Sequence, residues 1–264
     1  MKTEVHITHI DTACILLEIG SFRILTDPTL DPAGDLYYHG FGAFSRKTSD
    51  PGITKDNLGN IDLVLLSHHQ HRDNLDREGR KWLETANCVL STIPASKAIK
   101  NVTGLQEWQT FSVCTTKVSN LRITAIPAQH RPWWLPEWIS GKVLGFVIEY
   151  DDQEGGVIYV AGDTVFFRGI REVANRFKVN IGIFNVGAVQ FPYLTGLGKY
   201  TMDGSDLIKA VEVLKPKFVI PVHSRGWTHF KEPEAKLKHL LLEEAKPPGS
   251  SVLFLNTGER TMML

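Results

Sequence analysis

The chain has 264 residues, enough for one large domain or two small ones and for a sizeable hydrophobic core. Lys plus Arg number 29 and Asp plus Glu number 29, so no net charge would attract a polyanion, and nucleic acid is not an expected partner. Three widely spaced cysteines favour reduced thiols, and no apolar run approaches the roughly 20 residues of a membrane helix, so we expect a cytoplasmic protein without stable membrane anchoring.

The N-terminal segment predicts an antiparallel meander. Short strand patterns occur at residues 5–7, 14–19 and 22–25, and the third ends before Pro28, which cannot donate to a ladder. Residues 28–60 show no sustained period, and so long a loop is typical of a lid or a binding loop, because most loops run to about 4–6 residues. A loop held down by its own aromatic side chains is the alternative.

The densest run of candidate ligands comes next. A buried strand pattern at residues 62–66 is followed directly by His68, His69, His71 and Asp73. A strand that delivers metal ligands at its end has this pattern. A histidine-rich surface turn would be the alternative if the cluster stood alone.

The rest of the chain alternates strands with helices, which indicates a layered α/β fold. No repeat or linker points to a second domain, so we expect one domain over residues 1–264. Strand patterns lie at 88–92, 111–114, 121–126, 143–150, 157–161, 181–187, 217–222 and 251–255, and helix patterns from Asp76 to about 86, at 96–100, at 169–177, from Asp203 to 214 and after Pro233.

Residues 131–142 form a proline-punctuated loop that contains Trp133, Trp134 and Trp138. Clustered tryptophans line a pocket, form an oligomer interface or touch a membrane surface. The loop lacks a basic flank, which favours a pocket or an interface between copies of the chain over a membrane contact.

Four strand patterns end in residues that can bind a metal ion: the cluster at 68–73, His130, Asp163 and His223. Ligands at strand ends are held by a rigid sheet. Imidazole and carboxylate without thiolate suit zinc, manganese or iron(II), and the lack of a nearby cysteine argues against a closed structural zinc site. Any one of these residues alone would be interpreted as structural, but together they predict a catalytic metal centre.

With these motifs the chain resembles the metallo-β-lactamase fold superfamily. It is most similar to the branch that contains L-ascorbate-6-phosphate lactonase and the N-acylphosphatidylethanolamine-hydrolysing phospholipase D. The resemblance covers nearly the whole chain and implies a four-layer αββα sandwich. It also implies that His130 joins the first-metal site, that Asp163 bridges two metals, and that His223 and Asp73 serve the second.

The family's usual H-x-H-x-D-H element is altered in this chain. Aligned on Asp73, it keeps His69 and His71 but has Asn74 in place of the last histidine, whereas a second alignment makes His68 the first ligand. The branch has a pattern similar to His-Asp-His-His-Ala-Asp-Asn, which favours His68, His71 and Asp73, with His69 in reserve. Because an amide is a weaker ligand than imidazole, the second site is weak, empty or rebuilt, and the chain holds one or two divalent ions.

These residues predict a metal-dependent hydrolase of a small-molecule ester, lactone or phosphoester. A metal ion lowers the pKa of its bound water from about 15.7 to about 7 and so supplies a metal-bound hydroxide. Asp73 or Asp163 would orient the water and accept its proton. The candidates for substrate contact are Tyr38, His39, Asn185 and Arg225, the last with a surface ion pair as the alternative.

Two other classes of protein remain open. The resemblance also admits an iron-dependent redox enzyme, since the fold hosts iron proteins, and the asparagine at position 74 admits a metal-binding protein without catalysis. Zinc is the first expectation for the metal, with manganese or iron as alternatives.

Overall fold

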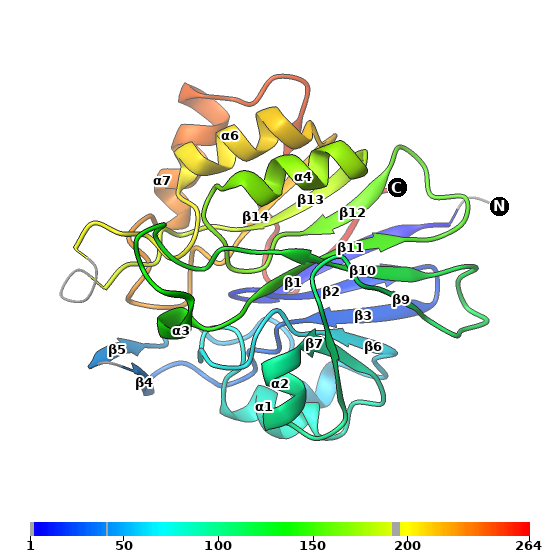
Figure 1. The fold of residues 1–264 in the computed structure, drawn as a ribbon, viewed down its shortest axis with the longest axis horizontal. Coiled ribbons are helices and arrows are strands. Elements are labelled where there is room, and N and C mark those ends of the chain that lie inside the picture. Colours follow the sequence, from blue (N-terminus) through cyan, green and yellow to red (C-terminus); the bar gives the residue numbers. More distant parts are fainter. Residues whose placement is uncertain (1–2, 41, 192–195) are drawn as a thin grey trace.

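Two β-sheets packed face to face form the centre of the molecule (Figure 1). The computed structural model describes residues 3–40, 42–191 and 196–264, and within them each sheet has seven strands. The first sheet contains β1 (Val5–Asp11), β2 (Cys14–Ile19), β3 (Phe22–Thr26), β6 (Leu63–Leu65), β7 (Val89–Thr92), β8 (Val102–Leu105) and β16 (Arg260–Met262), in the order β16-β1-β2-β3-β6-β7-β8.

The second sheet contains the strands that His130, Asp163 and His223 follow. It contains β9 (Thr110–Ser112), β10 (Arg122–Pro127), β11 (Leu144–Glu149), β12 (Val157–Val160), β13 (Val179–Asn185), β14 (Phe218–Val222) and β15 (Ser251–Val252), in the order β15-β14-β13-β12-β11-β10-β9. Neighbours from β12 to β15 pair in parallel, so the ends of β12, β13 and β14 lie at one edge of the sheet.

Helices cover the outer face of each sheet (Figure 1). Those of the first sheet are α1 (Arg77–Leu83) and α2 (Ile93–Ala98), and those of the second are α4 (Arg168–Arg176), α6 (Gly204–Leu214) and α7 (Glu234–His239), the last continuing as a π-helical turn, η2 (Leu240–Glu244). The short helices η1 (Lys55–Asn57) and α3 (Glu137–Ser140) lie in connections. The predicted four-layer αββα sandwich is confirmed.

Burial explains why the layers stack in this order. Side chains such as Ile7 and Leu17 of the first sheet and Ile123 and Phe146 of the second form one buried cluster between the sheets. A second cluster joins the outer face of the second sheet to α4 and α6, and a third joins the first sheet to α1. Strand β13 is buried along its whole length, as expected for a strand covered on both faces.

Most predicted elements are present with small shifts at their ends. The N-caps are confirmed, because Asp76 Oδ1 accepts a hydrogen bond from Gly79 N at 2.8 Å and Asp203 Oδ1 accepts one from Asp206 N at 2.9 Å. The helical turn expected at 96–100 begins earlier, as α2, because Thr92 caps it. The final strand was predicted wrongly: residues 251–255 form only the two-residue β15, and the chain closes with β16 against β1.

The expectation of an unstructured loop over residues 28–60 was also wrong. The segment contains an antiparallel hairpin of β4 (Leu36–Gly40) and β5 (Ala43–Arg46). Lys47 follows the hairpin with its side chain fully buried, and its ammonium group pairs with the Asp11 carboxylate and lies 3.7 Å from Asp76 Oδ2. A second contact comes from Arg46, the last residue of β5, whose N–H donates to Thr228 Oγ1 at 3.0 Å. The hairpin is therefore anchored to the first sheet.

No helix within the described ranges is long and apolar enough to cross a bilayer.

Replacing Lys47 by methionine tests this anchor. The variant keeps the apolar stem but leaves Asp11 buried without its cation, so we expect the free energy of unfolding in urea to fall by about 3–5 kcal/mol. Lys55→Met is the control, because Lys55 pairs with Glu78 at the surface, and it should leave the urea midpoint almost unchanged. Equal midpoints for the two variants would contradict an anchoring role for Lys47.

Candidate metal centre

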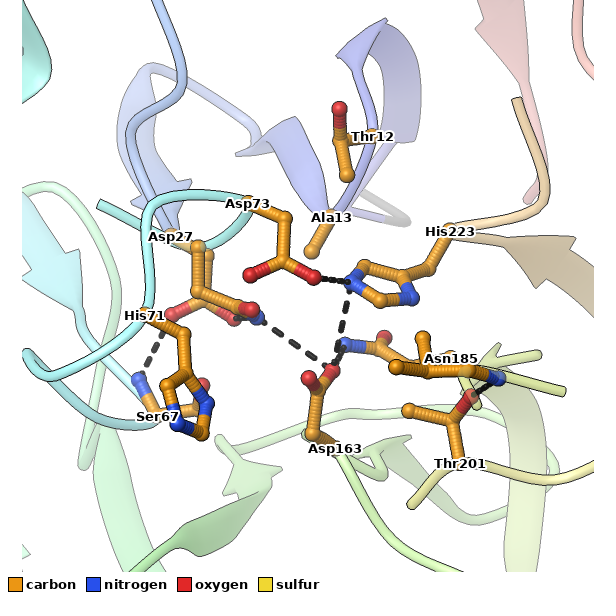
Figure 2. Close-up of polar contacts among 12 residues, drawn as sticks. Thr12, Ala13, Asp27, Ser67, His71, Asp73, Asp163, Asn185, Thr201 and His223 are labelled. Atoms are coloured by element: carbon orange, nitrogen blue, oxygen red, sulfur yellow. Dashed lines mark hydrogen bonds and ion pairs between the residues drawn. The ribbon is translucent and has the colours of Figure 1, made fainter. Parts of the chain in front are cut away.

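The predicted ligands meet where the ends of strands from both sheets come together, and Figure 2 shows four of them, His71, Asp73, Asp163 and His223. The loop after β6 brings His68, His71 and Asp73, and the ends of β10, β12 and β14 bring His130, Asp163 and His223. The six side chains form two groups that could each hold a metal ion: His68, His71 and His130, and Asp73, Asp163 and His223.

Three imidazole nitrogens converge in the first group. His71 Nδ1 lies 3.1 Å from His68 Nε2 and 3.0 Å from His130 Nε2. Donor atoms about 2.0–2.1 Å from a tetrahedral zinc ion stand about 3.3 Å apart, so these spacings fit one ion. The second ring nitrogens of His68 and His130 have other partners. His68 Nδ1 contacts Ser67 Oγ at 2.9 Å, and His130 Nδ1 donates to the Tyr200 carbonyl oxygen at 2.9 Å. These contacts orient the inner nitrogens toward a common point.

Burial keeps the first group in the form that binds a metal. Desolvation lowers the pKa of His71 to about 3 and holds the pKa of His68 and of His130 below the ordinary value. Neutral imidazoles present lone pairs, and three lone pairs facing one another cannot all be satisfied by hydrogen bonds within the group. The donor set therefore fits a divalent cation.

The second group combines two carboxylates with one imidazole (Figure 2). His223 Nε2 lies 3.4 Å from Asp73 Oδ2 and 3.6 Å from Asp163 Oδ1, while its Nδ1 contacts the Val186 carbonyl oxygen at 3.3 Å. Burial opposes a charge on His223, but the carboxylates of Asp163 and Asp73 outweigh it and raise its pKa to about 9. This group also fits a cation, because it holds two buried carboxylates against one imidazole.

Asparagine side chains hold the Asp163 carboxylate in place. Asn185 Nδ2 donates to Asp163 Oδ1 at 2.7 Å, and Asn74 Nδ2 donates to the same oxygen at 3.3 Å and to Asp27 Oδ2 at 3.4 Å. Asp27 in turn accepts a hydrogen bond from Ser67 N at 2.7 Å. Asn185, predicted to contact substrate, and Asn74, the reserve ligand, thus both hold a candidate ligand through Nδ2, and Asn74 Oδ1 has no hydrogen-bond partner among the described residues.

Local backbone geometry explains how two of the candidate ligands are presented. Gly162, directly before Asp163, has φ +62°, and a Cβ there would lie 2.5 Å from the Leu144 carbonyl oxygen, so only glycine fits the turn. His223 itself has φ +63°, and its N–H donates to the Thr12 carbonyl oxygen at 2.9 Å. A non-glycine residue in this conformation is strained, and such strain concentrates at functional sites.

The remaining predicted residues lie apart from the two groups. His69 is half-buried, and its side chain belongs to neither group, whereas His68 belongs to the first. Tyr38 is exposed and packs against Phe44. Arg225 lies 3.6 Å from Glu234, which is the ion pair considered as its alternative. Neither Tyr38 nor Arg225 belongs to the described residues that line the cavity beside the metal groups, and their predicted substrate contact stays a prediction.

That cavity, of about 430 Å³ with its open mouth, borders both groups. His39, on the β4–β5 hairpin, reaches it as predicted, with its Nδ1 4.0 Å from Asp73 Oδ1. Burial lowers the pKa of His39 to about 4, so its imidazole is neutral. The lining residues are His39, Gly40, Ala43, His71, Asp73, His130, Ile139, Ser140, Val189, Phe191 and Tyr200.

Two buried residues at the centre were missed from the sequence. His229 Nε2 lies 2.9 Å from Asp73 Oδ2, and Asp27, whose pKa is raised to about 7 by burial, supports Asn74 and Ser67. The signal for His229 was a histidine six residues after His223. For Asp27 the sequence showed only that the residue follows the end of a strand pattern.

Comparison with known proteins agrees with this geometry. A family model described as the beta-lactamase superfamily domain matches residues 6–223. A metal-dependent hydrolase of Pyrococcus furiosus is 28% identical over 256 residues, covering 97% of this chain and 98% of its own. Among solved structures, an isothiocyanate hydrolase from Delia radicum gut bacteria has a TM-score of 0.77 at 21% identity, with coverage of 97% and 98%. A possible metal-dependent hydrolase from Veillonella parvula has a TM-score of 0.81 at 21% identity, with full coverage of both chains.

Family match, fold and candidate metal groups point to one conclusion: the chain belongs to the metallo-β-lactamase superfamily as one of its metal-dependent hydrolases.

Asn185→Ala tests the support of Asp163. Removing the 2.7 Å donor frees the carboxylate to rotate, so we expect metal affinity, measured by competition with a chelator, to fall by about 10–100-fold. Asn180→Ala is the matched control, because Asn180 lies on the same strand but donates to the Glu154 carbonyl oxygen at 2.9 Å. Unchanged affinity in both variants would show that Asn185 does not position a metal ligand.

Proposed function

We propose that the protein uses bound divalent ions, zinc first, to hydrolyse a small, uncharged and largely apolar ester or lactone. The observation that carries the proposal is that two buried ligand groups border one cavity whose lining includes the apolar side chains of Ile139, Val189 and Phe191. Imidazole and carboxylate donors suit zinc, with manganese or iron as alternatives.

In this proposal His68, His71 and His130 would hold the first ion, and Asp73, Asp163 and His223 would hold the second. A bound divalent ion would supply Lewis acidity and lower the pKa of water at the site toward about 7.

The two carboxylates are suited to different tasks. Asp163 Oδ1 is held by two asparagine amides, which suits a fixed ligand. Asp73 lines the cavity, and its Oδ1 has no hydrogen-bond partner in the described part of the chain. We therefore assign to Asp73 the task of orienting the attacking water and accepting its proton. His39, neutral and beside Asp73, is placed to contact the substrate.

The lining of the cavity favours an uncharged substrate over a phosphoester. Ile139, Val189 and Phe191 contribute apolar side chains to the lining of the cavity. No lysine or arginine is among the described residues that line it. A phosphoester would have only the bound ions, and no side-chain cation, to pair with its charge, whereas a carboxylic ester or lactone carries no charge that needs a partner. A lactonase-like reaction therefore fits best.

The domain organisation, the location and the partners that we propose rest on the sequence. We propose one functional domain over residues 1–264, a cytoplasmic location and no nucleic-acid partner, on the linker-free pattern, the sparse cysteines and the balanced charge. Segment 28–60 would act as a wall of the site through His39. The exposed side chains of Trp133 and Trp138 suit contact with a second copy of the chain.

Hydrolysis of paired substrates tests the proposal. Protein stripped with a chelator should not hydrolyse p-nitrophenyl butyrate or a γ-lactone, and zinc, manganese or iron should restore the activity. The metal-loaded protein should prefer these compounds to p-nitrophenyl phosphate. His130→Ala should abolish both metal retention and activity, and the exposed His239→Ala should keep both. Activity that survives chelation, or a preference for the phosphate, would overturn the proposal.

A further inference from the structure

The second ligand group lacks the imidazole that the superfamily's usual motif supplies at position 74. Asn74 is fully buried, and its amide already donates to Asp27 and Asp163. Its Nδ2 therefore holds the Asp163 carboxylate, and its Oδ1, which has no hydrogen-bond partner among the described residues, is a weaker ligand than an imidazole nitrogen. Asp73, Asp163 and His223 remain as three protein donors, the number that a catalytic zinc site combines with one water, but only one of them is an imidazole.

His229 approaches the same carboxylate from the other side. Its Nε2 lies 2.9 Å from Asp73 Oδ2, the oxygen that also lies 3.4 Å from His223 Nε2. Both spacings are close to the roughly 3.3 Å that separates two donors on one tetrahedral ion. The ring of His229 is buried, and its Nδ1 has no hydrogen-bond partner among the residues described. Two imidazoles thus converge on one carboxylate oxygen.

Packing holds the imidazole of His229 in this position. The ring stacks on Phe191 with centroids 5.5 Å apart and lies edge-on to Phe230 at 4.7 Å. The backbone beside it is also fixed, because Thr228 N donates to the Arg46 carbonyl oxygen at 3.1 Å and Lys231 N donates to the Gly187 carbonyl oxygen at 2.9 Å. A ligand that is held before the ion arrives loses little conformational freedom on binding.

His39 is the other imidazole near Asp73, and its position is less suited to binding an ion at the second group. Its Nδ1 is 4.0 Å from Asp73 Oδ1, and its Nε2 is tied to Ser45 Oγ at 2.6 Å. It also lines the open cavity, where a substrate would meet it. His229 does not line the cavity and lies behind Asp73 among aromatic rings.

We propose that His229 supplies the imidazole that Asn74 does not, and that it binds the second ion together with Asp73, Asp163 and His223. The inference rests on the proposed function only in requiring an ion at this group, and it needs no knowledge of the substrate. Two imidazoles and two carboxylates form a donor set that zinc, iron(II) and manganese accept. The chain then holds two ions, because a histidine from the loop after β14 rebuilds the second site.

Metal counting on purified full-length variants tests the inference. We expect the wild-type chain, loaded with zinc and dialysed, to retain two equivalents by plasma mass spectrometry. His229→Ala and His229→Gln should each retain one. Glutamine can keep a hydrogen bond to Asp73 but is a weak zinc ligand, so two equivalents in His229→Gln would show that His229 only orients Asp73, and would overturn the inference.

Two controls make the count specific. His39→Ala should retain two equivalents, and loss of an ion there would overturn the inference in favour of His39. His130→Ala should lose the first ion, and near-ultraviolet circular dichroism of the metal-free variants should match the wild type, which excludes misfolding. A wild-type chain that binds one equivalent would overturn the inference and leave the hydrolase proposal standing, whereas a chain that binds none would overturn both.

Discussion

The structure depends on the burial of two carboxylates, Asp73 and Asp163, at the seam between the sheets. Taking a charged carboxylate out of water costs several kcal/mol even after relaxation, unless a cation and hydrogen bonds replace the solvent. One protonated histidine, His223, lies between them, which leaves a net negative charge in the metal-free chain. A divalent ion at this position would remove the imbalance, and the neighbouring histidine triad offers three lone pairs to another ion.

The fold tolerates the free-energy cost of burying these carboxylates because rigid elements hold the site. The loops that carry the ligands follow strands of both sheets, whose shared core is fully buried. Asn74 and Asn185 satisfy Asp163, and backbone carbonyl groups fix the orientation of His130 and His223. The β4–β5 hairpin then closes one side of the cavity, so the ligands are held between a packed core and an anchored wall.

Local patterns predicted the parts of the site that follow strands. An apolar run that ends in a possible ligand indicated His130, Asp163 and His223, which the structure brings into the two candidate metal groups, because strand direction fixes where the next residue points. The choice between His68 and His69 needed the structure, since one inserted residue makes both alignments possible. His229 follows no strand pattern, and Asp27, although it follows a strand, gave no sign of its partners; tertiary packing brings the two residues to Asp73 and Ser67. The hairpin at 36–46 was missed since its exposed aromatic residues hide the alternation of a strand.

Anomalous scattering at the zinc edge, from crystals grown with zinc, tests the central claim most directly, because it locates each ion and its ligands together. The account predicts one peak enclosed by His68, His71 and His130 and a second beside Asp73, Asp163 and His223. Peaks at surface residues only, or a first peak bound by His69 in place of His68, would contradict it.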